Sequence, residues 1–324
     1  MKAIGLISGG LDSALAVFLL KKQGIEVVAL HFLSPFWKSK NTIGQLAQDL
    51  DIELREIAVG KEYLELVQNP QFGYGKNLNP CIDCKIWMLK EAKREMEREG
   101  AGFVFTGEVV GQRPKSQLKN TLRLIEKQSG LEGYLLRPLS AKLLPPTIPE
   151  EQGWVKREEL LDLQGRGRKR QLALAKKWGI KHFSPPAGGC LLTDPNFSGR
   201  LKDLWESEEA YNFESVELLK VGRHFRLGPS FRLVVGRNQA ENEKLKEFVQ
   251  EGDILFFPGE GKGPLALGRG KADESLLQEA ASLLARYISS SRDIIPVGIK
   301  KAGSILEILE VERMSEEEVK KRMI

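Results

Sequence analysis

Short apolar runs alternate with stretches of helical spacing through the first half of the chain. Runs of strand length occur at 2–8, 26–33, 53–59, 102–106 and 134–136. Helical patterns lie between them, at 11–23, 41–51, 61–68, 82–99 and 115–128. This alternation predicts an α/β fold, a parallel sheet with helices on both faces. In such sheets ligands bind beyond the carboxyl ends of the strands.

The pattern changes in the second half of the chain. Two turn-rich segments, 144–149 and 184–189, bracket a basic stretch, and short strands dominate from about residue 205. The strands predicted for a largely antiparallel sheet are Leu218–Val221, Phe231–Val235, Ile254–Phe257 and Leu265–Leu267. Helices are predicted at Asn238–Gln250 and Ser275–Ser289. We therefore expect two domains, 1–204 and 205–324, the second a smaller α+β domain.

The composition, 41% hydrophobic and 29% charged residues, is that of an ordinary soluble protein. A chain of 324 residues can form two domains with separate cores. No apolar stretch of the sequence approaches the length of a membrane span. The sequence opens on a strand pattern without a signal or transit segment, so we expect a cytoplasmic location.

Positive charge is concentrated in two stretches, although the net charge is only +5. Residues 165–181 contain no acid and seven basic residues: Arg166, Arg168, Lys169, Arg170, Lys176, Lys177 and Lys181. Residues 218–237 contain no acid and five: Lys220, Arg223, Arg226, Arg232 and Arg237. Such stretches suit a nucleic-acid backbone, but either alone is equally consistent with a solvated basic surface.

The segment Ser8-Gly9-Gly10-Leu11-Asp12-Ser13 follows the first strand and opens the first helix. Such a turn points backbone N–H groups and the positive helix end at an anion, and glycines let the backbone approach a phosphate closely. Ser8 and Ser13 can add hydroxyl donors, and Asp12 can bind the Mg²⁺ that accompanies a nucleotide. The segment lacks the lysine of P-loop NTPases and the GxGxxG spacing of dinucleotide-binding proteins. We predict a nucleotide phosphate site of another kind.

Three cysteines complete the candidate chemistry. Cys81 and Cys84 form a CxxC pair at the start of a predicted helix, and Cys190 follows a proline- and glycine-rich loop. The sequence leaves four arrangements open. Three thiolates can hold a [4Fe–4S] cluster with one iron free for a further ligand, or Cys81 and Cys190 can act as a persulfide and resolving pair. Alternatively zinc binds with His182 as fourth ligand, or the thiols are unrelated.

The glycine turn resembles the PP-loop of the ATP pyrophosphatase superfamily, whose members bind ATP, adenylate a carbonyl oxygen and release pyrophosphate. Within that superfamily the chain looks most like the tRNA thiouridine synthases. Residues 107–117 resemble the GxxxGQxxSQ segment of the bacterial 4-thiouridine synthase, and Arg137-Pro138-Leu139 resembles its RPL motif. Together the resemblances cover about residues 1–200.

The cysteines add to this resemblance. NPCxxC at 79–84 and GGC at 188–190 resemble the segments that hold the two sulfur-relay cysteines of the bacterial tRNA 2-thiouridylase. The additional Cys84 makes the set look like that of the cluster-dependent tRNA thiolases, which use three cysteines and a free iron. The resemblance therefore implies a [4Fe–4S] cluster on Cys81, Cys84 and Cys190, with the Cys81–Cys190 relay as the alternative.

Expected roles follow for individual residues. Asp12, Cys81 and Cys190 are expected to be catalytic. The expected ATP-binding residues, with Mg²⁺ on Asp12, are Ser8, Gly9, Gly10, Asp12, Ser13, Leu30, Phe32, Thr106, Gly107 and Gln112. The expected contacts with a tRNA backbone are Arg166, Arg168, Lys169, Arg170, Lys176 and Lys177. Sulfide or a persulfide from a cysteine desulfurase is the expected sulfur donor, and related enzymes suggest a homodimer.

Residues 205–324 resemble the NFACT-type RNA-binding domain, through 220–225 and 233–238. The combination predicts an ATP-dependent tRNA sulfurtransferase that makes 4-thiouridine, with 2-thiouridine as the nearest variant. Three other classes remain: a PP-loop ligase or amidase acting on a small carboxylate, an RNA-binding protein without catalysis, and a desulfurase of thiolated bases. The first leaves the cysteines without a role, and the intact glycine turn counts against the other two.

Overall fold

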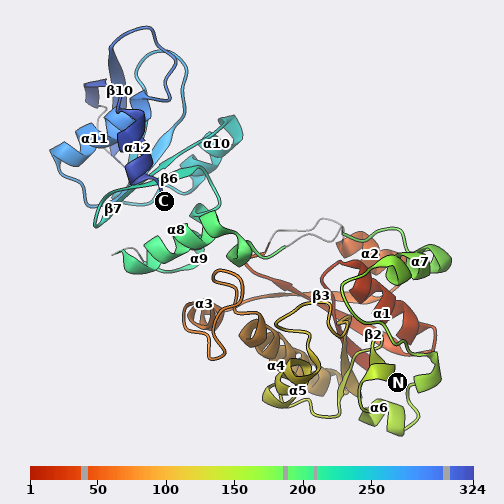
Figure 1. The fold of residues 1–324 in the computed structure, drawn as a ribbon. Coiled ribbons are helices and arrows are strands. Elements are labelled where there is room, and N and C mark those ends of the chain that lie inside the picture. The colour runs from red at the N-terminus through yellow and green to blue at the C-terminus, as the bar shows by residue number, and fades with distance from the viewer. Residues whose placement is uncertain (38–42, 185–188, 208–209, 302–306) are drawn as a thin grey trace. The chain divides into compact units, whose positions relative to one another are not determined.

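The chain forms two compact units, Met1–Thr193 and Asp194–Ile324 (Figure 1). The computed structural model describes residues 1–37, 43–184, 189–207, 210–301 and 307–324. The predicted division after residue 204 falls inside helix α8 (Pro195–Glu206), which belongs to the second unit. Asp203 of this helix pairs with Arg226 at 2.5 Å, and this ion pair ties α8 to the strands that follow it.

Five parallel strands form the sheet of the first unit, in the order β3-β2-β1-β4-β5. Their bounds are β1 (Lys2–Leu6), β2 (Glu26–Leu33), β3 (Glu53–Ala58), β4 (Phe103–Thr106) and β5 (Leu135–Leu136). The strand order reverses at β1, which pairs with β2 on one side and β4 on the other. In an open α/β sheet a crevice forms at such a switch point, beyond the carboxyl ends of the strands. The turns that follow β1 and β4 therefore lie at this crevice.

Helices cover both faces of this sheet, as the alternation of apolar positions predicts. Ala3 of β1 belongs to a core shared with α1 (Leu11–Lys21), α2 (Ile43–Asp49) and α7 (Lys169–Trp178). The next residue, Ile4, belongs to a second core. That core is shared with α4 (Cys81–Glu99) and α5 (Lys119–Gln128). The predicted α/β class is confirmed. Helices α3 (Lys61–Gln68) and α6 (Ile148–Glu151) complete the α-helices described in this unit.

The second unit is built on a six-stranded antiparallel sheet in the order β11-β10-β8-β9-β7-β6. The strands are β6 (Arg223–Gly228), β7 (Phe231–Val235), β8 (Ile254–Pro258), β9 (Ala266–Gly270), β10 (Ile294–Lys301) and β11 (Glu307–Glu312). The helices after α8 are α9 (Phe213–Leu218), α10 (Gln239–Glu247), α11 (Glu274–Ala285) and α12 (Glu316–Arg322). Apolar residues of α11 pack on the sheet, which gives the predicted α+β domain its core.

One strand predicted for this unit is wrong. Residues 218–221 are not a strand but the end of α9 and the turn after it. Asn212 caps this helix by accepting a hydrogen bond from the Ser215 N–H at 2.8 Å, and such a cap starts a helix regardless of strand-like apolar residues downstream. The first strand is β6 instead. Strands β10 and β11 and helix α12 were not predicted.

Within the residues that the structure describes, no helix combines the length and the apolar character that a membrane crossing requires.

Candidate functional site at the carboxyl end of the first sheet

The turn between β1 and α1 is built from backbone. Gly9 has φ +69°, a left-handed conformation that residues with a Cβ adopt only at a cost. Gly10 is the N-cap residue of α1. Because glycine has no side chain, no side chain of the N-cap residue accepts a hydrogen bond from the first turn of the helix. The first N–H groups of a helix have no intrahelical acceptor, so they are available to an anion. Ser8 lies exposed in the same turn.

The side chains of the first helical turn have unequal partners. The Ser13 hydroxyl donates to the Gly10 carbonyl at 2.9 Å, so its proton is directed at the backbone. Gln112 Nε2 donates to Asp12 Oδ2 at 2.9 Å. Asp12 Oδ1 is buried and has no hydrogen-bond partner among the described residues. An unpartnered buried carboxylate oxygen fits a Mg²⁺ ligand, since Mg²⁺ binds through one or two carboxylates and substrate phosphates.

The loop after β4 touches the first turn of α1 directly. A Cβ on Gly107 would lie 2.5 Å from the Ser13 nitrogen and 2.6 Å from the Asp12 carbonyl carbon. Only glycine fits this approach, so the two turns at the switch point are packed backbone to backbone. Thr106, at the end of β4, is buried and donates to Glu108 at 3.2 Å.

Glu108 is the centre of a buried ionic cluster that sequence reasoning missed. It accepts hydrogen bonds from Lys85 Nζ and, at 3.2 Å, from Arg137 Nε. Arg137 also donates to Glu126 at 2.9 Å. Burial by itself raises the pKa of Glu108, but Lys85 and Arg137 outweigh it and lower the pKa to about 2. Because Lys85 belongs to α4, this cluster ties the helix of the CxxC pair to the loop beside Asp12.

The strand end predicted to read adenine is engaged in the sheet. The Leu30 carbonyl accepts a hydrogen bond from the Ile7 N–H at 2.9 Å. The Phe32 ring packs against Trp87 of α4, with ring centroids 5.5 Å apart and planes at 67°. His31 Nδ1 lies 3.1 Å from the Ile7 carbonyl oxygen. An adenine contact at this strand end therefore stays a prediction.

Two of the three thiols share one buried side chain, Asn79. Cys81 Sγ donates to Asn79 Oδ1, and Asn79 Nδ2 donates to Cys190 Sγ at 3.0 Å. The third thiol has a different partner: the buried Tyr63 hydroxyl donates to Cys84 Sγ at 2.9 Å. The structure thus places Cys190 and Cys81 close enough to Cys84 to act on it electrostatically, and it adds Asn79 and Tyr63 as the groups that contact the thiols. A shared site for the three cysteines stays a prediction.

Burial favours the protonated form of two of the thiols, Cys84 and Cys190. Burial raises the pKa of Cys84 to about 12, and the nearby Cys190 and Cys81 add to the effect. Burial likewise raises the pKa of Cys190 to about 11. The donor chemistry of three neighbouring thiols suits an iron–sulfur cluster. The described residues nevertheless contain no preformed group of three or more cysteine, histidine or acidic side chains placed to hold a metal ion.

The segment that leads to Cys190 starts at the glycine turn between β1 and α1. The Ser184 N–H donates to the Gly9 carbonyl at 2.8 Å, and the Leu191 N–H donates to the Phe36 carbonyl at 2.8 Å. Cys190 itself forms a β-bridge with Trp37. Residues 185–188, which were predicted as the flexible loop before Cys190, lie outside the described residues.

His182, the only histidine offered for a zinc site, has another partner. Its Nδ1 contacts the Asp49 carboxylate of α2, and its side chain is half exposed. This contact places it with α2 rather than with the thiols.

Helix α7 carries much of the first basic stretch. It packs against α1, where Trp178 stacks on Phe18 with ring centroids 4.7 Å apart. Lys176 and Lys177 are exposed in its last turn. Arg170 pairs with Asp162 at 2.6 Å, so its charge is partly neutralised. Arg166 and Arg168 precede the helix, which begins at Lys169.

The second basic stretch is far less cationic in the fold than in the sequence. Acids from elsewhere in the second unit pair with three of its members: Glu217 with Lys220, Asp203 with Arg226 and Glu241 with Arg237. Arg232 is fully buried, and Arg223 lies over the Tyr287 ring at 5.1 Å. Residues 218–237 therefore offer a nucleic acid less positive charge than a count of their basic residues predicts.

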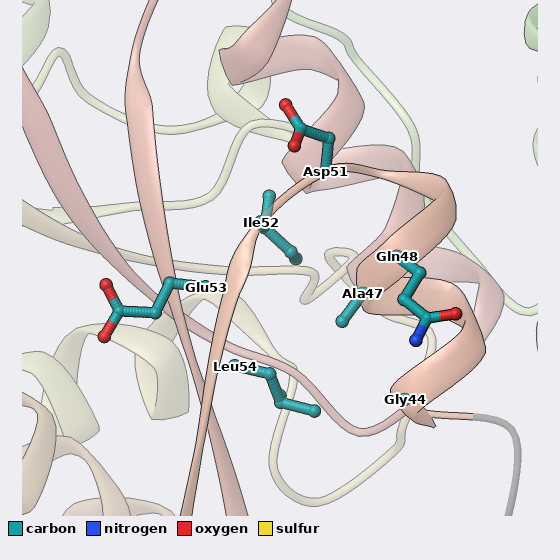
Figure 2. A pocket seen from close by; sticks show the side chains of 7 residues that line it. All are labelled: Gly44, Ala47, Gln48, Asp51, Ile52, Glu53 and Leu54. Carbon is teal, nitrogen blue, oxygen red and sulfur yellow. The ribbon is translucent and has the colours of Figure 1, made fainter.

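A hollow of about 690 Å³ lies between α2 and the start of β3 (Figure 2). It is lined by Gly44, Ala47, Gln48, Asp51, Ile52, Glu53 and Leu54. The Glu53 side chain points away from α2, and the lining includes no basic or nucleophilic side chain (Figure 2). This hollow therefore lacks the chemistry of the switch-point crevice.

Two family models match the two ends of the chain. Residues 1–142 match the thiamine biosynthesis protein (ThiI) model, and residues 222–323 match the NFACT protein RNA-binding domain model. The resemblances that the motifs predicted are confirmed for these two regions. The first match lies within the first compact unit and the second within the second unit.

Individual curated proteins are similar to part of this chain. A probable tRNA sulfurtransferase of Thermococcus kodakarensis is 29% identical over 147 residues, which cover 43% of this chain and 36% of the relative. A tRNA-specific 2-thiouridylase of Clostridium botulinum is 29% identical over 115 residues, covering 31% of this chain and 32% of the relative. The chain thus spans about a third of the length of these relatives. A crystal structure of a 4-thiouridine synthetase–RNA complex with bound ATP is 24% identical, with TM-score 0.40, and covers 60% of this chain and 45% of that one.

Proposed function

We propose that this chain is an ATP-dependent tRNA sulfurtransferase that adenylates a uridine carbonyl oxygen and replaces it by sulfur, making 4-thiouridine. The proposal rests on the ThiI-type domain, on relatives named as tRNA sulfurtransferases and on the chemistry at the switch point. A carbonyl oxygen is a poor leaving group, so its conversion to an adenylate must precede attack by sulfur.

The PP-loop binds ATP in this proposal. The free N–H groups of the first turn of α1 and the Ser8 hydroxyl hold the phosphates, and Asp12 Oδ1 holds the accompanying Mg²⁺. Donors fixed in the backbone stabilise the charge that develops on pyrophosphate without reorganising, which is the most effective way to stabilise a transition state electrostatically. Thr106, Gly107, Leu30 and Phe32 stay predicted neighbours of the nucleotide.

The thiols supply sulfur in this proposal. Cys81, Cys84 and Cys190 would hold a [4Fe–4S] cluster, which when bound supplies an iron without a cysteine ligand that can carry sulfide. Loading requires the three thiols to lose their protons and to leave their hydrogen bonds with Asn79 and Tyr63. Asp83, which lies between the two cysteines of the CxxC pair in the sequence, accepts from the Gln71 N–H at 2.8 Å.

One observation carries the proposal: the chain that bears Cys190 starts on the PP-loop. Ser184 is hydrogen-bonded to Gly9, and Cys190 follows six residues later. Since an extended chain spans at most about 3.5 Å per residue, the Cα atoms of Ser184 and Cys190 lie no more than about 21 Å apart. This link between the two sites supports adenylation and sulfur delivery to one substrate base, which in the proposal is drawn out of its stack to the end of the sheet.

RNA is the expected macromolecular substrate. The NFACT-type domain supports binding to RNA, and the exposed lysines of α7 suit a phosphate backbone. Such contacts position a substrate without reading its sequence.

The test is nucleoside mass spectrometry. Unmodified tRNA is incubated anaerobically with iron-reconstituted protein, Mg-ATP and sulfide, and a parallel reaction omits ATP. We expect a thiouridine that appears only with ATP and elutes as the 4-thio isomer. ATP consumption without any thiolated base would contradict the proposal and would redirect the search to another donor or to a substrate other than RNA.

Two alternatives have specific support. The Clostridium relative is named for 2-thiouridine, so the 2-thio isomer is the second candidate product, and its retention time distinguishes it. A persulfide relay without a cluster is supported by Asn79, which contacts the Cys81 and Cys190 thiols and leaves Cys84 on Tyr63.

A further inference from the structure

The two carboxylate oxygens of Asp12 have different environments. Oδ2 accepts the Gln112 hydrogen bond at 2.9 Å, whereas Oδ1 is buried and unpartnered among the described residues. A buried acceptor without a partner costs free energy, roughly 1–3 kcal/mol, and a native protein retains such a group where something else binds it. The carboxylate of Asp12 thus has one oxygen that accepts a hydrogen bond and one oxygen without a hydrogen-bond partner among the described residues.

The position of Gln112 is set by a closed backbone turn. The Gln112 N–H donates to the Val109 carbonyl at 3.1 Å, and the Gly111 N–H donates to the Gln117 carbonyl at 2.7 Å. Val110 anchors the start of this turn, because its N–H donates to the Ser140 hydroxyl at 3.0 Å. Gly107, a few residues earlier, is packed on the backbone of Asp12 itself. The amide of Gln112 is therefore held against Asp12 from both ends of the loop.

We propose that Gln112 is a positioning residue that confines Asp12 to one metal-binding oxygen and thereby favours Mg²⁺ over Ca²⁺ at the PP-loop. This inference rests on the proposed function, in which ATP and a divalent cation bind there. Mg²⁺ demands a compact octahedral shell and binds single carboxylate oxygens, whereas Ca²⁺ accepts six to eight oxygens and takes carboxylates in bidentate fashion. In bidentate binding by Asp12 the cation would share Oδ2 with the Gln112 amide, which competes for the electron density of that oxygen and weakens the second metal contact.

This role differs from the one that the sequence predicted for Gln112. The sequence placed it beside the α-phosphate or the target base. In the structure one of the two N–H donors of its amide is used by Asp12, and through this contact Gln112 acts on the nucleotide by way of that carboxylate. Orienting groups of this kind typically change metal affinity by about 10- to 100-fold when they are removed.

The test compares nucleotide binding with two cations and needs no turnover. The Kd of a non-hydrolysable ATP analogue is measured by calorimetry on the full chain, once in saturating Mg²⁺ and once in saturating Ca²⁺. The variant Gln112→Met keeps the length of the side chain and removes the donor. We expect it to raise the preference for Ca²⁺ relative to Mg²⁺ by about tenfold compared with the unmodified chain.

A matched control comes from α2. Gln45 Nε2 donates to Asp49 Oδ1 at 3.1 Å on an exposed surface, so Gln45→Met removes the same kind of bond outside the site. It should leave the ratio of the two Kd values unchanged. Thermal unfolding verifies that each variant is folded, and Gln112→Glu, which also lacks the donor and adds a carboxylate, should shift the ratio towards Ca²⁺ more strongly.

The possible results distinguish a failure of the role proposed for Gln112 from a failure of the proposed ATP site. If the unmodified chain binds the analogue but neither Gln112 variant changes the cation ratio, the positioning role is overturned and the proposed function stands. If the unmodified chain binds the analogue with neither cation, the ATP site itself is overturned, and the inference about Gln112 falls with it.

Discussion

The PP-loop and the cysteine neighbourhood lie at the same end of one sheet, yet they differ in how complete they are. The PP-loop is made of backbone: a left-handed glycine, free helix N–H groups and one open carboxylate oxygen. The cysteine neighbourhood is made of side chains that are already satisfied by one another. Asn79 and Tyr63 occupy the thiols, and burial keeps Cys84 and Cys190 protonated.

This difference implies that the two sites need different changes before they can bind their ligands. An anion can enter the PP-loop without displacing a hydrogen bond, because the N–H groups of a helix start are unsatisfied in any case. A metal or sulfane sulfur can enter the cysteine neighbourhood only when thiols release protons and side chains turn. We therefore expect nucleotide binding to survive changes at the cysteines, and sulfur loading to survive changes at the PP-loop.

Substitution of Asp12 tests whether loading at the cysteines survives a change at the PP-loop, and it has the largest expected effect. Asp12→Ala removes both the Mg²⁺ ligand and the acceptor of Gln112, and we expect pyrophosphate release with tRNA to fall by about 100-fold or more. Asp12→Asn keeps an acceptor for Gln112 but loses the charge, so it should be nearly as impaired. The iron-loaded visible spectrum should be unchanged in both variants. A lost spectrum would mean that the two sites are coupled.

Substitution of Cys84 tests whether nucleotide binding survives a change at the cysteines. Cys84→Ala removes one of three thiolates, so a cluster held by three cysteines should lose its iron and its visible absorption, and thiouridine formation should stop. Binding of the ATP analogue should persist at unchanged Kd. With a cysteine desulfurase persulfide as donor, a relay between Cys81 and Cys190 would instead retain most of the thiolation, because Cys84 contacts Tyr63 rather than Asn79. Retained activity without iron would therefore replace the cluster by the relay.

The Glu108 cluster connects the two sites and is tested by stability. Glu108→Gln removes the carboxylate partner of the partly buried Lys85 and leaves the buried Arg137 with Glu126 alone, and breaking a buried ion pair in this way costs about 3–5 kcal/mol. Urea unfolding at pH 7 measures the loss. The control Glu91→Gln removes a surface pair with Arg94 and should cost under about 1 kcal/mol.

The pH dependence of the same cluster has a definite sign. The pKa of Glu108 is lowered to about 2 from its ordinary value of 4.5, so its contribution to stability is complete above pH 4.5. It is lost as the pH falls from there towards 2. The unmodified chain should therefore lose more stability over this range than Glu108→Gln does. Equal losses would show that Glu108 is not ionised in the fold.

Much of the first unit was predictable because its signals are local. Strand and helix periodicity located β1 to β5 and the helices between them, and the glycine turn located the PP-loop. The Glu108 cluster was not predictable, since Lys85, Glu108 and Arg137 come from separate elements and no local pattern pairs them. The same holds for Asn79 and Cys190, which meet only through the fold.

The second unit was predicted less well for a physical reason. Its strand β6 begins at a basic residue and β11 is rich in glutamate, so apolar runs do not mark them. The apolar run at 218–221 instead belongs to a capped helix and its turn. The charge of its basic stretch was also misjudged, because the neutralising acids Asp203 and Glu241 lie outside the stretch.

The reactivity of the thiols tests directly whether Cys84 and Cys190 are protonated before loading, and the expected effect is smaller. With a pKa of about 11, only about one Cys190 thiol in a thousand is ionised at pH 8, and Cys84, at about 12, is ionised tenfold less. Alkylation of the metal-free chain, followed by mass spectrometry, should modify both sites far more slowly at pH 8 than in unfolded protein, with rates rising up to pH 10. Rapid alkylation at pH 8 would mean that the thiols are already prepared for loading.

The smallest expected effect concerns RNA, and it compares helices on opposite faces of the sheet. Lys176→Gln with Lys177→Gln removes two exposed charges from α7, whereas Lys119→Gln with Lys127→Gln removes two from α5. If α7 contacts the tRNA backbone, the first pair should reduce the slope of log Kd against log salt by about two, one for each lysine. The second pair should leave the slope unchanged. Equal slopes in both variants would remove α7 from the RNA interface and would assign the electrostatic contacts to other residues, because lysines that touch phosphate must change the number of counterions released.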